Sequence, residues 1–122
     1  MMNLDIKTKI AILKLHLSIA FVDNEYSEEE ENLIKDLCIK FQIDFKTRVK
    51  ITKEISTTKM TMPQICRQEL KNIKTKSLQK ECLKSLAAVC AADFILYEDE
   101  LMLLQLIAEE WGMFIKELNE KD

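Results

Sequence analysis

The chain of 122 residues contains a single glycine, Gly112, and a single proline, Pro63. Tight turns, β-hairpins and glycine-rich phosphate loops depend on these two residue types. A chain with so few of them is expected to consist mainly of α-helices joined by short connections. Its length fits one domain, and its 48% of hydrophobic residues suffice for a folded core. We therefore predict an all-α fold, a single helical domain of about seven helices.

Apolar residues recur at spacings of three and four along most of the chain, which places them on one face of each expected helix. The first helix is expected from about Leu4 to Val22, with Asn3 as its N-cap, and its apolar face is wide enough for a largely buried helix. The remaining helices are expected at about 28–41, 45–55, 63–73, 78–92, 98–110 and 114–119. In the third of these seven helices the apolar positions are Phe45, Val49 and Ile55.

Helix starts are marked by capping residues. Ser27 is followed three residues later by Glu30, the spacing of a capping box in which each side chain binds the backbone N–H of the other residue. Asp44 is expected to cap the third helix, and Pro63 suits the first turn of the fourth.

An acidic motif occurs twice. Asp23 precedes Glu30 by seven residues, and Asp93 precedes Glu100 by the same interval. Shifting the sequence by seventy residues also aligns the apolar residues that follow each motif and pairs Phe41 with Trp111. We predict an internal two-fold pseudo-repeat, with half-repeats at about 4–43 and 77–113 joined by a basic segment at about 44–76.

The interval from Asp to Glu invites comparison with a calcium-binding EF-hand loop, whose final ligand is a bidentate Glu. The earlier ligand positions of such a loop would fall on Ile19 and Phe21 in the first copy and on Val89 and Ala91 in the second. None of these side chains offers an oxygen, so a true EF-hand is excluded.

A more open metal site remains an alternative. Its candidate ligands are the acidic residues of the two motifs, Asp23, Glu25, Glu30, Asp93 and Glu100. Carboxylate oxygens suit Mg²⁺ or Ca²⁺, so one of these ions would be the cofactor in this alternative. The competing interpretation is structural, because Glu30 can act in the capping box and Asp23 can accept hydrogen bonds from loop N–H groups.

The other reactive residue types give little indication of chemistry. His16 is the only histidine, lies inside the first expected helix and has no second group that would make it a catalytic base, so we predict a structural role. The four cysteines form no C-x-x-C pair and are expected to be small core residues with free thiols. The N-terminal segment does not resemble a secretory signal, so a cytoplasmic location is expected.

Charge is distributed unevenly along the chain. Residues 1–39 carry a net charge of −4 and residues 81–122 carry −7, whereas residues 40–80 contain eleven basic and three acidic residues, giving +8. The basic middle either attracts the acidic ends of the same chain or contacts an acidic partner or an anionic membrane surface. Nucleic acid is not the expected partner, because lysine far outnumbers arginine and aromatic residues are few there. The most apolar stretch is too short for a membrane span.

The acidic motif resembles the signature of the tellurite-resistance TerB-like domain family, A-D-G-x-[IV]-x-x-x-E, which that family shows once in each half of an all-helical domain. The first copy here consists of Asp23, Asn24, Tyr26 and Glu30. The second consists of Asp93, Phe94, Leu96 and Glu100. Asn24 and Phe94 stand where the family has glycine, so both copies depart from the family's motif at this position.

The resemblance implies a cytoplasmic, non-enzymatic domain linked to stress and tellurite resistance, to membrane-associated complexes and to divalent metal binding. Its expected partners are other proteins, with association between copies of the chain left open. The alternative function is a helical adaptor that uses the basic middle segment to bind an acidic protein or an anionic membrane surface.

Overall fold

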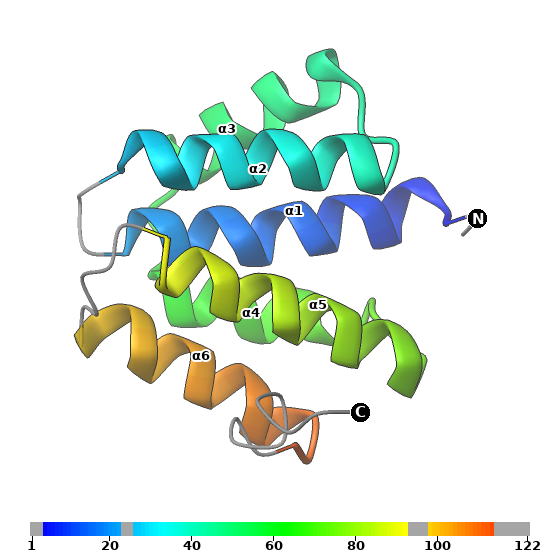
Figure 1. Cartoon of the computed structure of the whole chain (residues 1–122), viewed down its shortest axis with the longest axis vertical. Helices are drawn as coiled ribbons and strands as arrows, with labels where there is room; N and C mark the ends of the chain where they lie inside the picture. Colours follow the sequence, from blue (N-terminus) through cyan, green and yellow to red (C-terminus); the bar gives the residue numbers. More distant parts are fainter. Residues whose placement is uncertain (1–3, 23–25, 93–97, 114–122) are drawn as a thin grey trace.

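The computed structural model describes residues 4–22, 26–92 and 98–113, and this part of the chain contains six α-helices and no β-strand (Figure 1). The helices are α1 (Ile6–Phe21), α2 (Glu28–Lys40), α3 (Phe45–Thr57), α4 (Met62–Leu70), α5 (Lys76–Cys90) and α6 (Glu98–Glu110). The all-α prediction is confirmed. The seventh predicted helix, at 114–119, lies outside the described residues.

The central element is α1, which packs against each of the other five helices. In Figure 1 it runs through the middle of the bundle, with α2 and α3 above it and α4, α5 and α6 below it. Every side chain from Ala11 to Ala20 is buried except that of Lys14. A helix that is apolar around its whole circumference is stable only when other helices surround it. The wide apolar face predicted for this segment therefore corresponds to the core of the molecule.

Lys14 shows how a charged residue is accommodated on this central helix. Its ammonium group forms ion pairs with Glu54 of α3, at 2.8 Å, and with Glu69 of α4, at 3.5 Å. The aliphatic part of a lysine can cover apolar surface while its charged end reaches polar partners. Lys14 thus links three helices at the one position between Ala11 and Ala20 where the side chain is not buried.

The helix starts follow the capping chemistry of the sequence. The side chain of Asp44 accepts a hydrogen bond from the backbone N–H of Thr47 and begins α3, as predicted. The first helix begins later than predicted, at Ile6, because Asp5 accepts a hydrogen bond from the N–H of Thr8 at 2.8 Å and acts as the N-cap. Asn3, the predicted cap, lies outside the described residues.

The prediction for the apolar face of α3 is wrong at two of three positions. Ile55 is buried, but Phe45 is 77% exposed and Val49 is 48% exposed. The buried face of α3 is formed by Ile51 and Ile55, which are one helical turn apart on a different side of the helix from Phe45 and Val49. Two apolar pairs at the same spacing compete within this helix, and only contact with α1 decides which pair faces inward.

Both α2 and α6 end in a Schellman motif, a turn in which the residue after the C-cap adopts a left-handed conformation. Gln42 has a φ of 57° and Gly112 a φ of 71°. The N–H of Ile43 binds the carbonyl oxygen of Cys38 at 2.8 Å, and the N–H of Met113 binds that of Ala108 at the same distance. These turns direct Ile43 and Met113 back into the core, where both are buried.

Substitutions at these two turns are expected to change stability in opposite directions. Gly112→Ala should lower the free energy of unfolding by about 1 kcal/mol, because a Cβ atom is disfavoured at positive φ. The added Cβ would meet only the Lys76 ammonium at 3.9 Å, an ordinary contact, so backbone strain is the dominant effect. Gln42→Gly should raise stability by up to about 1 kcal/mol. Urea denaturation measures both, and a stabilising Gly112→Ala variant would contradict this explanation.

No helix in the described ranges is long and apolar enough to cross a bilayer.

Candidate functional site at the acidic end of the bundle

Two of the five predicted metal ligands can be placed. Glu30 and Glu100 are the third residues of α2 and α6, respectively, and each is only 1% exposed. Asp23, Glu25 and Asp93 lie outside the described residues. Buried carboxylates are costly in a protein unless hydrogen bonds or a positive charge compensate them. The burial of Glu30 and Glu100 is therefore the main observation to be explained at this site.

The helices that carry these two glutamates start on the same side of the molecule. In Figure 1, the last turns of α1 and α5 and the first turns of α2 and α6 all lie at the left end of the bundle. Cys90, the last residue of α5, donates its S–H to the backbone oxygen of Glu100 at 3.8 Å, which holds the end of α5 against the start of α6. The described parts of both motifs are therefore found at one end of the bundle.

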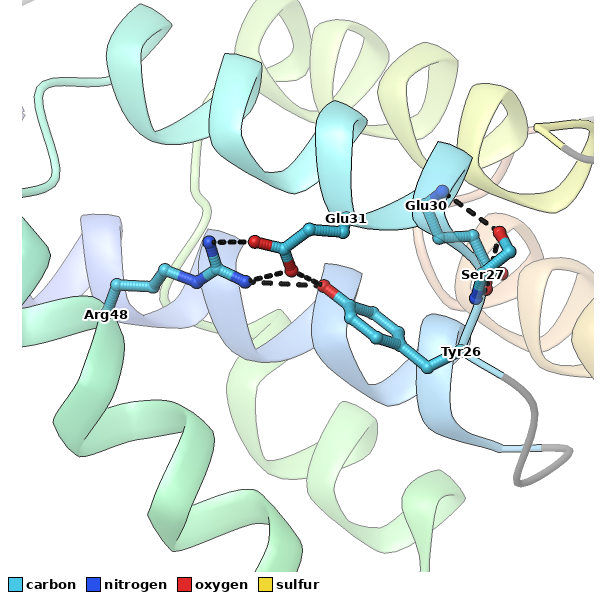
Figure 2. A network of polar contacts seen from close by, with 5 residues as sticks. All are labelled: Tyr26, Ser27, Glu30, Glu31 and Arg48. Carbon is cyan, nitrogen blue, oxygen red and sulfur yellow. Dashed lines mark hydrogen bonds and ion pairs between the residues drawn. The ribbon is translucent and has the colours of Figure 1, made fainter.

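The capping box predicted at Ser27 is confirmed. The hydroxyl oxygen of Ser27 accepts a hydrogen bond from the N–H of Glu30 at 3.0 Å, and one carboxylate oxygen of Glu30 accepts the N–H of Ser27 at 2.9 Å (Figure 2). Glu30 also lies in the first turn of α2, where the helix dipole stabilises negative charge. The capping box thus supplies hydrogen bonds to one carboxylate oxygen of Glu30 and lowers the free-energy cost of burying this side chain.

Beside the capping box lies a polar network that the sequence did not predict. Arg48 of α3 donates from its two terminal nitrogens to the two carboxylate oxygens of Glu31, at 2.9 and 2.6 Å (Figure 2). The hydroxyl group of Tyr26 donates to Glu31 at 2.5 Å and accepts a hydrogen bond from Arg48 at 3.3 Å. The network fastens Glu31 of α2 and Tyr26, two residues before that helix, to Arg48 of α3.

The electrostatics of this network follow from its partial burial. The hydrogen bond from Arg48 holds the pKa of Glu31 below its ordinary value. Burial, together with the carboxylate of Glu31, raises the pKa of Tyr26, so its hydroxyl group stays protonated as a donor. The sequence contains one weak signal for this site: Arg48 is one of only two arginines among eleven basic residues of the middle segment, and arginine is suited to bidentate binding of carboxylate.

His16 and the cysteines belong to the core. The imidazole of His16 is fully buried, and its Nδ1 lies 2.7 Å from the backbone oxygen of Ile12. Its Nε2 has no hydrogen-bond partner in the described part of the chain. Burial lowers the pKa of His16 to about 4, so the ring is neutral at pH 7. The structural role predicted for this residue is therefore supported by its position.

All four cysteines are buried and none forms a disulfide, in agreement with the predicted role of small core residues. Burial raises the pKa of Cys66 to about 12 and raises that of Cys82 as well. A thiol with a raised pKa carries little reactive thiolate at neutral pH.

Metal-ligating side chains do not gather elsewhere. Within residues 4–22, 26–92 and 98–113, no three His, Cys, Asp or Glu side chains are close enough together to hold a metal ion. A metal site at the acidic end would therefore need Glu30 or Glu100 together with at least one of Asp23, Glu25 and Asp93. Because these side chains offer only carboxylate oxygens, the donor set fits Mg²⁺ or Ca²⁺ better than Zn²⁺.

Basic side chains of α1 and of the middle segment form a different kind of surface. A shallow hollow of about 340 Å³ between α1 and α4 is lined by several polar residues, among them Lys7, Lys14 and Lys71. Lys14 is already paired with two glutamates, so Lys7 and Lys71 supply the remaining positive charge. On α3, the lysines face solvent beside Phe45 and Val49.

Comparisons with known proteins do not identify a relative: a scan of protein-family models found no match, and searches of curated proteins and of solved structures found no significant match.

Proposed function

We propose that this chain is a non-enzymatic, TerB-like helical domain of the stress and tellurite-resistance type that binds a divalent metal ion at the acidic end of its bundle. One observation carries the proposal: Glu30 and Glu100 hold the same position in α2 and α6 and are both buried. A cation bound between the two motifs would place positive charge beside these two buried carboxylates, whose oxygens are suitable ligands for it.

The internal pseudo-repeat is part of this proposal. Two features support it beyond the recurrence of Asp and Glu: α2 and α6 have the same length of 13 residues, and both end in a Schellman motif. Phe41 and Trp111 are equivalent in the repeat and are both buried at these ends. Two helical hairpins related in this way would bring the two acidic motifs to one end of the bundle.

The non-enzymatic part of the proposal is supported by the state of the reactive groups. The imidazole of His16 is enclosed in the core, and the thiols are buried. A general base or a nucleophile must reach its substrate, which these groups do not.

The metal-binding proposal predicts a specific loss on substitution. Calorimetric titration with Mg²⁺, Ca²⁺, Mn²⁺ and Zn²⁺ should show binding of Mg²⁺ or Ca²⁺ with a dissociation constant of about 1 mM or lower. Glu100→Gln should weaken this binding at least about tenfold, because one charged ligand becomes neutral. Glu29→Gln is the matched control, since Glu29 lies in the same helical turn as Glu30 but is exposed, and it should change affinity less than about twofold.

Thermal denaturation provides an independent readout of the same site. A metal ion at ten times its dissociation constant should stabilise the wild-type chain by about 1.4 kcal/mol. The Glu100→Gln variant, if folded by circular dichroism, should lose most of this gain. Absence of both binding heat and stabilisation at several millimolar metal would refute the proposed site.

The second candidate function is a binding adaptor that uses the basic middle segment. The exposed lysines of α3 next to Phe45 favour it, because a basic surface with apolar residues suits an acidic partner or an anionic membrane. Sedimentation with vesicles that contain phosphatidylserine, compared with neutral vesicles, tests the membrane form of this function. Equal binding to both kinds of vesicle would count against it.

A further inference from the structure

The outer surface of α3 combines apolar and basic side chains. Phe45 and Val49 are exposed and lie one helical turn apart, and Lys46, Lys50 and Lys53 are exposed beside them. None of these three lysines forms an ion pair within the described part of the chain. We refer to these five residues as the α3 face.

The outer surface of α6 has the same organisation with the opposite charge. Met102 is 60% exposed, and Leu106, one turn further along, is half-buried. The exposed acidic residues around them are Glu98, Asp99, Glu109 and Glu110, and the helix contains no basic residue. These acidic residues also lack ion pairs within the described chain. We refer to the two apolar and four acidic residues as the α6 face.

The two faces cannot meet within one molecule. The central helix α1 packs against both α3 and α6 and lies between them. In Figure 1, which is drawn with the longest axis vertical, α3 is near the top and α6 is at the bottom. Because α1 lies between the two helices, the charges of one face do not pair with those of the other within one molecule.

We infer that the α3 face of one copy of this chain binds the α6 face of a second copy. Three lysines that form no ion pair in the described part of the chain then lie opposite four acidic residues that form none. Phe45 and Val49 can pack against Met102 and Leu106, because both pairs are spaced by four residues, about 6 Å along a helix. This inference rests on the second candidate function, binding through the basic segment, and is independent of the metal site.

The geometry of such a contact determines which assemblies form. Because different surfaces of the two copies meet, each dimer keeps one free α3 face and one free α6 face. Association therefore continues from dimers to short chains as concentration rises. An anionic membrane would satisfy the lysines and Phe45 but would leave the α6 face without an occupant, whereas a second copy accounts for both faces.

Sedimentation velocity over a range of concentrations, up to about 1 mM, tests the inference, since small polar interfaces are weak. The wild-type chain should form dimers and larger species at low salt. Raising the salt from about 0.05 to 0.5 M should increase the dissociation constant at least about tenfold, because the attraction is electrostatic.

Two charge-reversed variants make the test specific. Lys46→Glu with Lys50→Glu makes the α3 face acidic, and Glu109→Lys with Glu110→Lys makes the α6 face basic. Each variant alone should raise the dissociation constant at least about tenfold, and an equimolar mixture of the two should associate again within about threefold of wild type. Lys59→Glu with Lys80→Glu reverses the same number of charges at exposed sites outside the α3 face and should associate like wild type, apart from the change in net charge.

Four outcomes would overturn the inference. The wild-type chain could remain monomeric at every concentration, the control could lose association as fully as the α3 variant, or the mixture could fail to restore it. Binding of a strictly monomeric chain to phosphatidylserine vesicles would also overturn it, while leaving the second candidate function standing. Circular dichroism of each variant separates loss of contact from loss of fold.

Discussion

Leu17→Ala is expected to lower the free energy of unfolding by about 3–4 kcal/mol. Leu17 is completely buried on α1, the helix that packs against all five others. Removing three carbon atoms there loses apolar burial and leaves a cavity that the surrounding helices can fill only in part. Because typical domains have a total stability of 5–15 kcal/mol, this single change would remove a large share of it.

Urea denaturation followed by circular dichroism measures this effect. Ile39→Ala is the matched control, since Ile39 loses a similar aliphatic side chain but is 77% exposed on α2. It should change stability by less than about 0.5 kcal/mol. Similar losses at both positions would mean that α1 is not the centre of the core.

The second large effect concerns acidification. His16 has a pKa of about 4 in the folded chain and an ordinary value of 6.5 when unfolded. Below pH 6.5 the unfolded state therefore binds a proton that the folded state does not bind until about pH 4. His16 should destabilise the fold progressively as the pH falls from about 6.5 to about 4, by a total of about 3 kcal/mol.

Substitution of His16 isolates this contribution from those of the carboxyl groups. His16→Leu fills a similar volume and cannot be protonated. Between pH 7 and pH 4 the wild-type chain should therefore lose about 3 kcal/mol more stability than this variant. His16→Asn provides a second neutral variant with a polar group. Urea denaturation at several pH values gives the comparison, and parallel curves for wild type and both variants would show that His16 does not titrate in this way.

Prediction succeeded where the determining interactions are local. Ser27 and Glu30 are three residues apart, as are Asp44 and the backbone N–H that it caps, so each interaction is encoded in a short stretch of sequence. The full circumference of α1 is apolar enough to indicate burial without knowledge of its neighbours. The bounds of α6 followed from the same kind of pattern.

Prediction failed or was incomplete where distant segments meet. Phe45 and Val49 have the spacing of a buried pair, yet Ile51 and Ile55 occupy the inward face. Arg48 and Tyr26 are 22 residues apart, and no local pattern indicates that both bind Glu31. At the acidic site the recurrence of Asp and Glu was evident, whereas the burial of Glu30 and Glu100 was not.

The sequence by itself determined that this chain forms helices, where most of them begin, and which helix is apolar enough to lie at the centre. These properties depend on capping and on periodicity within a few residues. Only the tertiary structure decided which face of α3 turns inward and that α2 and α6 start at the same end of the bundle. It also decided that a basic face and an acidic face lie on opposite sides of α1. The physical reason is that several apolar helix surfaces could pack with nearly equal energy. Contacts between residues far apart in the chain decide which of these surfaces are buried.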